Sequence, residues 1–221
     1  MRDMHCHILP GVDDGAPDLE ASLEMLEAAR AVGVTSIVCT PHARSPYFDY
    51  EKMVEAYGIF RDAAAKAAPD VHVAMGFEVA HKKLMQLGVE DWAPYLRFAE
   101  TPEFLLELDT ACNAADFQEY ERTIYTLQGM GLTVIIAHPE RYHAIQKDIQ
   151  IARNLVNMGC KLQASADFIA GGRFGREKKP AKKMFEERLY TYIASDAHKP
   201  EHYTYLAQAR RDFPVRGKHF K

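Results

Sequence analysis

The 221-residue chain has few cysteines, no long apolar run and little excess charge, and each shortage excludes a class of protein. Its four cysteines, Cys6, Cys39, Cys112 and Cys160, form no Cys-x-x-Cys pair. We therefore expect reduced core thiols in a cytoplasmic protein rather than a disulfide framework. No apolar run approaches the roughly 20 residues of a membrane span, which predicts no membrane insertion and no cleaved leader. A net charge of -4 gives no support to a nucleic-acid partner.

The composition is that of an ordinary globular protein, with 48% hydrophobic and 26% charged residues. The length predicts one domain over residues 1–221. Strand-like runs alternate with helical patterns, which favours a parallel sheet with helices outside it. The expected strands cover roughly 3–8, 35–40, 71–77, 104–108, 132–137, 160–165 and 189–195. The expected helices cover roughly 19–30, 50–68, 80–88, 116–130, 146–158, 176–188 and 201–211, with a linker around 92–94. This pattern alone allows an open doubly wound sheet or a closed barrel.

The stretch 3–15 opens the chain with alternating side chains, so His5 and His7 share one strand face while Cys6 lies on the other. Two such imidazoles can hold one divalent metal ion. Two histidines that are merely hydrogen-bonded in a strand are an equally good interpretation of this motif by itself.

Histidine and carboxylate side chains recur at the carboxyl end of one expected strand after another, where the active sites of barrels are built. One such histidine is usually structural, but a converging set is typical of a metal centre that holds two or three ions. The candidate ligands are His5, His7, Asp14, His42, Glu78, Glu107, His138, Asp196 and His198. The other histidines are expected on the surface or beside the ligands; they are His72, His81, His143, His202 and His219.

With these residues in place, the chain resembles the polymerase-and-histidinol-phosphatase (PHP) superfamily, and within it the bacterial capsular-polysaccharide protein tyrosine phosphatases of the CpsB/YwqE type. The order and spacing of the motifs agree from residue 3 to about residue 200. The matching blocks are 3–15, Thr-Pro-His at 40–42, Gly-Phe-Glu at 76–78, Leu-Leu-Glu-Leu at 105–108, Ala-His-Pro-Glu-Arg-Tyr at 137–142, Met-Gly-Cys at 158–160 and Ser-Asp-Ala-His at 195–198. The resemblance implies a distorted seven-stranded (βα)7 TIM-like barrel of the PHP type, with the active site at the carboxyl ends of the strands.

The resemblance also implies a centre of two or three divalent ions, commonly manganese, iron or zinc. His5, His7, Glu78 and Asp196 would surround the first ion. Glu78 would bridge to a second ion that is held with Glu107 and His138, while Asp14, His42 and His198 would bind the third.

The implied activity is hydrolysis of phosphotyrosine on the tyrosine-rich tail of an autophosphorylated bacterial tyrosine kinase that controls capsular or exopolysaccharide synthesis. The reaction would proceed by attack of a metal-bridged hydroxide, with Asp196 and Arg141 as catalytic residues. The Arg141 guanidinium would bind the substrate phosphate, for which its bidentate geometry is suited. A homo-oligomer is a further implication of the resemblance.

One departure from the family concerns the segment after Ser-Asp-x-His, where an arginine near the phosphate is usual and Lys199 leads directly into a helix here. Arg44, which we take as a substrate-binding candidate, or else Arg173 or Arg176, could replace it. A cysteine-dependent phosphatase mechanism is disfavoured by the residues themselves. Such enzymes place an arginine six positions after the nucleophilic cysteine, and this chain has Val12, Ser45, Gln118 and Ala166 there.

Two rival functions stay open at this point. A PHP-type phosphoesterase for small molecules, such as histidinol phosphate or a sugar phosphate, could use the same ligands, and a regulatory module could bind phosphate without turnover. Two surfaces are also open to two interpretations each. The basic stretch 173–188 is either a solvated helix face or a docking surface for an acidic kinase tail, and Tyr47, Phe48 and Tyr50 either line a phosphotyrosine pocket or belong to the core.

Overall fold

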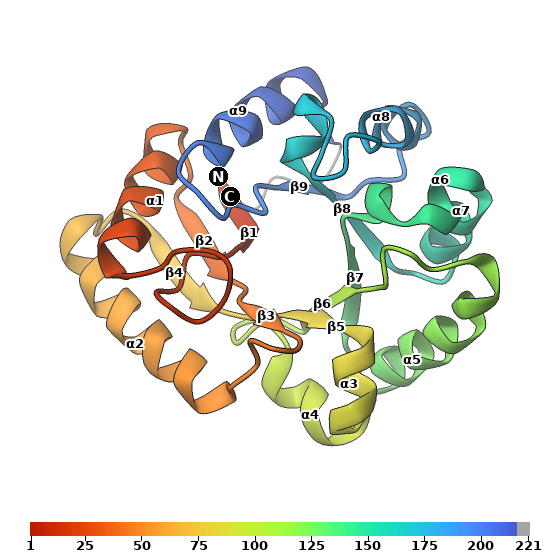
Figure 1. The fold of residues 1–221 in the computed structure, drawn as a ribbon, viewed down its shortest axis with the longest axis horizontal. Helices are drawn as coiled ribbons and strands as arrows, with labels where there is room; N and C mark the ends of the chain where they lie inside the picture. The colour runs from red at the N-terminus through yellow and green to blue at the C-terminus, as the bar shows by residue number, and fades with distance from the viewer. Residues whose placement is uncertain (216–221) are drawn as a thin grey trace.

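In the computed structural model, which describes residues 1–215, parallel strands form a curled wall and the helices lie outside it (Figure 1). The strands are β1 (Arg2–Cys6), β2 (Ser36–Cys39), β3 (His42–Ala43), β4 (His72–Met75), β5 (Glu78–Ala80), β6 (Glu103–Glu107), β7 (Thr133–Ala137), β8 (Lys161–Ser165) and β9 (Tyr192–Ala194). The helices are α1 (Leu19–Ala31), α2 (Tyr50–Ala67), α3 (His81–Leu87), α4 (Val89–Leu96), α5 (Phe117–Gly129), α6 (His143–Lys147), α7 (Gln150–Asn157), α8 (Lys178–Glu186) and α9 (His202–Asp212).

The strands form two parallel sheets, one in the order β1-β2-β4 and the other in the order β3-β5-β6-β7-β8-β9. Two of the expected strands are each followed by a short strand of the other sheet: the expected strand 35–40 is β2 and precedes β3, and the expected strand 71–77 is β4 and precedes β5. Pro41, which has no N–H to donate, separates β2 from β3, and Gly76-Phe77 separates β4 from β5. The seven-stranded barrel expected from the sequence is not confirmed, since the described residues form nine shorter strands in two sheets.

The first and last strands meet where β9 ends. Cys6 and Ala197 form a parallel bridge, the His7 N–H donates to the Ala197 carbonyl (2.8 Å) and the Asp196 N–H donates to the His5 carbonyl (2.8 Å). A small cluster of buried apolar side chains also joins strands of both sheets; it consists of Met4, Val38, Phe98, Leu105, Ile135, Ala137 and Ala194. These contacts bring the carboxyl ends of β1 and β9 side by side.

The larger hydrophobic core lies between the strands and the surrounding helices. Met53 and Phe60 of α2, Ile124 of α5 and Leu206 of α9 are fully buried in it. Amphipathic helices of this kind are stabilised by burying one face against a sheet. All seven expected helical segments are present.

Two boundaries differ from the sequence prediction. The expected linker around 92–94 is helix α4, which contains Pro94 and is stabilised by burial of Ala93 and Leu96. The expected helix 146–158 is divided into α6 and α7 at Asp148, whose backbone is extended and whose carboxylate accepts the Gln150 N–H (2.9 Å). This local hydrogen bond from the backbone to the Asp148 side chain competes with a continuous helix and marks the boundary between α6 and α7.

The buried carboxylate of Asp3 links β1 to the segment after β9, so weakening this link should lower the stability of the fold. Asp3 is fully buried and accepts the Ser195 N–H (2.9 Å) and the Ser195 hydroxyl (2.6 Å). Substitution Ser195→Ala removes one donor from this carboxylate, and we expect the free energy of unfolding to fall by about 1–3 kcal/mol. Urea denaturation measures the change, and Ser36→Ala is the control because the half-buried Ser36 hydroxyl makes no hydrogen bond to a described residue. An equal effect of the two substitutions would contradict the prediction.

Candidate metal centre

The nine predicted ligands lie together where β1, β6, β7 and β9 end and where β3 and β5 begin. β1 and the loop after it carry His5, His7 and Asp14, and β3 and β5 begin with His42 and Glu78. Glu107 ends β6, His138 follows β7, and Asp196 and His198 follow β9. Four overlapping groups have ligand atoms within 4.8 Å of one another; they are His7-Asp14-His42-His198, His5-His7-Asp196, His5-Glu78-His138 and His42-Glu78-Glu107. Every candidate ligand belongs to at least one group.

The backbone at two of these residues adopts a conformation that is rare without glycine. His138, directly after β7, has φ of 29°, and Asp196, two residues after the end of β9, has φ of 49°. Such left-handed backbone costs free energy and is concentrated at functional sites. At Gly15 a Cβ atom would lie 2.0 Å from the His7 carbonyl oxygen, so only glycine allows this loop to fold back over His7. That close approach brings Asp13 and Asp14 to the centre.

Glu78 is the middle of the centre. Its Oε1 lies 2.7 Å from His138 Nε2 and 3.4 Å from His5 Nε2, while its Oε2 lies 2.6 Å from His42 Nδ1. Burial disfavours the ionised form, but the neighbouring imidazoles outweigh it and hold the pKa of Glu78 well below its usual range. Burial and the charge of Glu78 together raise the pKa of Glu107 to about 7. A carboxylate surrounded in this way is suited to bridge two cations.

His5 and His7 present their Nε2 atoms to Asp196 because other residues bind their Nδ1 atoms. The two Nε2 atoms lie 3.4 and 3.3 Å from Asp196 Oδ1. Gln163 Nε2 donates to the Ala164 carbonyl, which leaves Oε1 to accept from His5 Nδ1 (2.9 Å). Asp13 Oδ2 accepts from His7 Nδ1 (2.8 Å). Such contacts fix the tautomer and orientation of ligating histidines.

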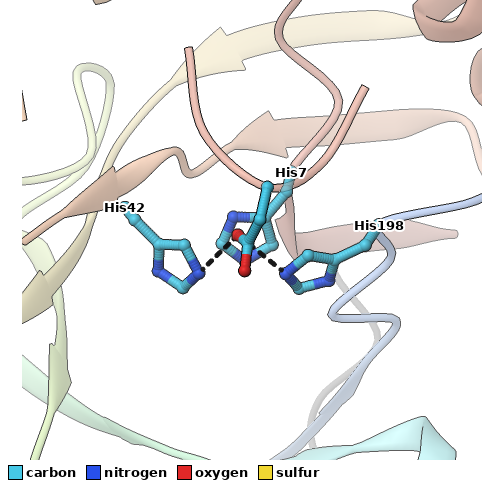
Figure 2. Close-up of side chains that lie close together, drawn as sticks. His7, His42 and His198 are labelled. Carbon is cyan, nitrogen blue, oxygen red and sulfur yellow. Dashed lines mark ion pairs between the residues drawn. The ribbon is translucent and has the colours of Figure 1, made fainter. Parts of the chain in front are cut away.

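Asp14 lies between two imidazoles at the outer end of the centre, and Figure 2 shows His7, His42 and His198 turned toward the same point. Asp14 Oδ1 is 3.1 Å from His42 Nε2 and 3.4 Å from His198 Nε2, the two ion pairs drawn as dashed lines in Figure 2. The His7 and His198 rings are stacked with their centroids 4.1 Å apart. This four-residue group is the predicted third set of ligands with His7 added.

The donor set fits divalent cations. Buried polar atoms in proteins are nearly always hydrogen-bonded, but several buried ligand atoms here have no hydrogen-bond partner among the described residues. They are Asp14 Oδ1, His42 Nδ1, Glu78 Oε2, His138 Nδ1 and His198 Nε2. Some of these atoms are close to one another, as His42 Nδ1 is to Glu78 Oε2 (2.6 Å), but without the geometry of a hydrogen bond. Imidazole nitrogens and carboxylate oxygens are the ligands of zinc, iron and manganese. The geometry therefore supports a centre for more than one such ion, and the grouping of ligands by ion stays a prediction.

Arg141 and Arg44 both reach the centre, and each contacts different ligands of it. The Arg141 Nη2 donates to Asp167 Oδ2 (3.0 Å) and Ser165 Oγ (3.1 Å) and lies 2.6 Å from Asp196 Oδ2. Arg44 Nη2 lies 2.8 Å from His42 Nε2 and 3.5 Å from Asp14 Oδ2. A dianionic ligand at the centre would therefore meet two guanidinium groups.

A cavity of about 770 Å³ opens beside the centre. It is lined by Arg44, Ala80, His81, Lys82, Met85, Gln86, Glu107, Leu108, Asp109, Thr110, Asp116, Glu119, Tyr120, Arg141, Arg173 and Phe174. Tyr47, Phe48 and Tyr50 do not line it, because Phe48 and Tyr50 pack against Phe77 and Trp92 and Tyr47 stacks on His42. Of these two interpretations, the structure supports the one that assigned them to ordinary packing.

The remaining histidines have varied surroundings. His72 is exposed beside Glu100, and His202 Nδ1 accepts the His198 N–H (3.3 Å). His81 is buried and bonds Thr123 Oγ1 (2.9 Å), so the expectation of a surface residue was wrong there. His143 is exposed at the start of α6, and His219 lies outside the described residues.

The cysteines are unsuited to nucleophilic catalysis. All four are buried and free, and burial raises the pKa of the Cys112 thiol to about 11 and of the Cys160 thiol to about 12. Their thiolate forms are therefore scarce near neutral pH. This agrees with the missing arginine six residues after each of them.

Known proteins are similar to this chain in sequence and fold. The family model for capsular polysaccharide synthesis, CpsB/CapC, matches residues 1–211. Tyrosine-protein phosphatase YwqE of Bacillus subtilis (strain 168) is 33% identical over 205 residues, which cover 90% of this chain and 77% of YwqE. Tyrosine-protein phosphatase CpsB of Streptococcus pneumoniae is 30% identical over 210 residues, which cover 90% of this chain and 83% of CpsB.

A solved structure matches as well. Crystal structures of YwqE from Bacillus subtilis and CpsB from Streptococcus pneumoniae are described as those of unique metal-dependent tyrosine phosphatases. The matching chain superposes with a TM-score of 0.80 at 29% identity and covers 95% of this chain and 87% of its own length. Among residues 1–215, no helix is long and apolar enough to cross a membrane.

The position of Glu78 predicts the effect of removing its charge. Glu78→Gln keeps the shape of the side chain but removes the anion shared by two groups of ligands, so we expect metal affinity to fall by more than about tenfold. Metal content after dialysis against a graded chelator, measured by mass spectrometry, gives the result. Glu100→Gln is the control, since Glu100 is an exposed glutamate whose one ion pair within residues 1–215 is with His72. Equal metal retention by both variants would exclude Glu78 as a ligand.

Substitution of Gln163 should lower metal affinity indirectly, through the orientation of His5. Gln163→Leu removes the acceptor for His5 Nδ1 while keeping most of the volume, and a loss of about 10- to 100-fold in metal affinity is expected. Gln128→Leu is the matched control, because Gln128 Nε2 donates to the Met158 carbonyl away from the centre. The same titration measures both variants, and unchanged affinity in Gln163→Leu would show that His5 needs no such partner.

Proposed function

This chain belongs to the CpsB/CapC family of capsular polysaccharide synthesis, and on that premise we propose that it is a metal-dependent protein tyrosine phosphatase. The observation that carries the proposal is the meeting of nine metal-type side chains with Arg44 and Arg141 beside one open cavity. Metal ligands, phosphate-binding cations and room for a side chain are the three parts that hydrolysis of a phosphotyrosine needs.

The nine ligands are proposed to hold two or three divalent ions, of manganese, iron or zinc. Bound divalent cations lower the pKa of water and neutralise charge on a phosphoryl group. His5, His7, Glu78 and Asp196 would hold one ion, Glu78, Glu107 and His138 a second, and Asp14, His42 and His198 a third. The chain's own contribution is to keep these donors in place.

Arg141 has two proposed roles. Its guanidinium would bind the phosphoryl oxygens, and its contact with Asp196 Oδ2 (2.6 Å) would hold that carboxylate ionised and oriented. Burial of Asp196 is outweighed by Arg141 and His5, which hold the pKa of Asp196 well below its usual range. Arg44, half-exposed at the mouth of the cavity, would bind the phosphate from the other side.

The proposed substrate is an autophosphorylated bacterial tyrosine kinase that controls capsular or exopolysaccharide synthesis. The cavity volume of about 770 Å³ is far larger than a phosphate needs and falls within the range of sites that bind small molecules and cofactors, which leaves room for a phosphotyrosine side chain. A cytoplasmic location is part of the proposal and is supported by the four free cysteines.

We also propose that residues 1–221 form one domain in which the two sheets act as a single distorted barrel of the PHP type. The parallel bridge between Cys6 and Ala197 and the apolar cluster shared by strands of both sheets support this. A barrel brings the ends of all strands to one face, which the shared metal centre requires.

A PHP-type phosphoesterase for small molecules is the alternative, because histidinol phosphate or a sugar phosphate would use the same ligands and arginines. Such an enzyme would prefer small alkyl phosphates over phosphotyrosyl peptides. A module that binds phosphate without turnover is less well supported, since binding alone does not need so complete a set of ligands.

The test is phosphate release from a phosphotyrosyl peptide, a phosphoseryl peptide and histidinol phosphate in the presence of manganese. We expect release from phosphotyrosine alone, and its loss by more than about 100-fold in His5→Ala, because a ligand of the centre is removed. His72→Ala, in which an exposed histidine is lost, should behave like the unaltered protein. A chelator should abolish the activity. Preferred release from histidinol phosphate would favour the alternative, and no release with metal bound would overturn the enzyme proposal.

A further inference from the structure

We infer that residues 171–177 form a specificity loop in which Arg173 binds the substrate phosphate and Phe174 contacts the aromatic ring of phosphotyrosine. This inference rests on the proposed function, and it gives the loop the role of recognising an aryl phosphate. Arg173 and Phe174 line the same cavity as Arg44 and Arg141. The loop follows the segment after β8 and leads into α8.

The loop is built to hold one conformation. Glu177 is fully buried, and its carboxylate accepts the N–H groups of Phe174 (2.8 Å) and Arg176 (2.7 Å). Gly172 has φ of 79°, and a Cβ atom there would lie 2.5 Å from the Glu177 carboxylate carbon. Burying a carboxylate costs free energy unless donors surround it, and two of the donors here are backbone groups of the loop. Glu177 therefore fixes the backbone that presents Arg173 and Phe174.

The charge around the centre leaves a role for Arg173. Arg141 is buried and already faces the carboxylates of Asp196 and Asp167. Arg173 is half-exposed, and its nearest acidic partner, Asp14 Oδ2, lies at 3.5 Å, which is a weak contact. A doubly charged phosphate would gain more from this available guanidinium than from one that is already paired.

The described residues that follow His198 do not supply another arginine to the centre. Arg210 Nη2 donates to the carbonyls of Arg2 (2.6 Å) and Ile193 (2.7 Å), and Arg211 pairs with Asp212. Within residues 1–215, Arg173 is thus the third arginine at the cavity beside Arg44 and Arg141, and Lys82 is a further cation in its lining. Arg176, on the same loop, does not line it.

Phe174 provides an apolar surface next to this cation. Its side chain is 53% exposed at the cavity, whereas Phe48 and Tyr50 are engaged in packing against Trp92. An exposed phenylalanine by itself is ordinary, but this one adjoins Arg173 on a loop held by a buried carboxylate. A phenyl ring attached to a phosphate at the centre would contact Phe174, and a methyl group would not gain from it.

Binding of two stable probes, phenylphosphonate and methylphosphonate, to the metal-loaded protein separates the two roles. Arg173→Ala should weaken both probes by about tenfold or more, because both carry the phosphonate. Phe174→Ala should weaken phenylphosphonate alone, by about 3- to 10-fold. Phe174→Tyr should keep the affinity for phenylphosphonate, and Arg176→Ala is the matched control for loss of charge from the loop. Calorimetry measures all affinities without turnover.

The outcomes distinguish this inference from the proposed function. Equal effects of Arg173→Ala and Arg176→Ala, or an equal effect of Phe174→Ala on both probes, would overturn the inference, as would failure of the unaltered protein to bind either probe. Phosphotyrosine hydrolysis by the unaltered protein would then still support the phosphatase. Conversely, the expected binding pattern without any hydrolysis would support the specificity loop and contradict the enzyme proposal.

Discussion

The buried contact between Glu78 and the imidazoles around it is the interaction on which the rest of the structure depends. A fully buried carboxylate is costly in a protein interior unless cationic or donor groups surround it. Here it lies 2.6 Å from His42 Nδ1 and 2.7 Å from His138 Nε2. The start of β3, the start of β5 and the end of β7 must therefore lie at the same level. The chain meets this requirement because β4 ends at Met75 and β5 starts anew at Glu78.

Neighbouring residues fix the orientation of the histidines around Glu78. Gln163 and Asp13 bind the Nδ1 atoms of His5 and His7, and the glycine at position 15 lets the loop that carries Asp13 fold over His7. The four carboxylates of Asp14, Glu78, Glu107 and Asp196 would, when all are ionised, match the charge of two divalent cations. Charge balance of this kind favours bound cations and leaves the arginines at the rim for an anionic substrate.

Much of the fold was predictable from local pattern because burial imposes it. The apolar runs at 36–39, 133–137 and 161–165 form strands, and each is followed by an amphipathic helix as expected. The division of the strands into two sheets was not predictable, since it follows from how the residues around Pro41 and Gly76 pack against other strands. The helix α4 was missed for a related reason, because tertiary burial of Ala93 and Leu96 outweighs the presence of Pro94.

The sequence by itself determined which side chains are available for the centre, because histidine and carboxylate residues at successive strand ends meet at one face in any parallel arrangement of this kind. It also determined the family, through motifs spread from residue 3 to residue 198. Only the tertiary structure decided the partners of those side chains, such as Gln163 for His5 and Asp196 for Arg141, and the place of Arg173 and Phe174 at the cavity. These contacts join residues that are far apart in the chain, and local sequence patterns carry no information about the distance between such residues.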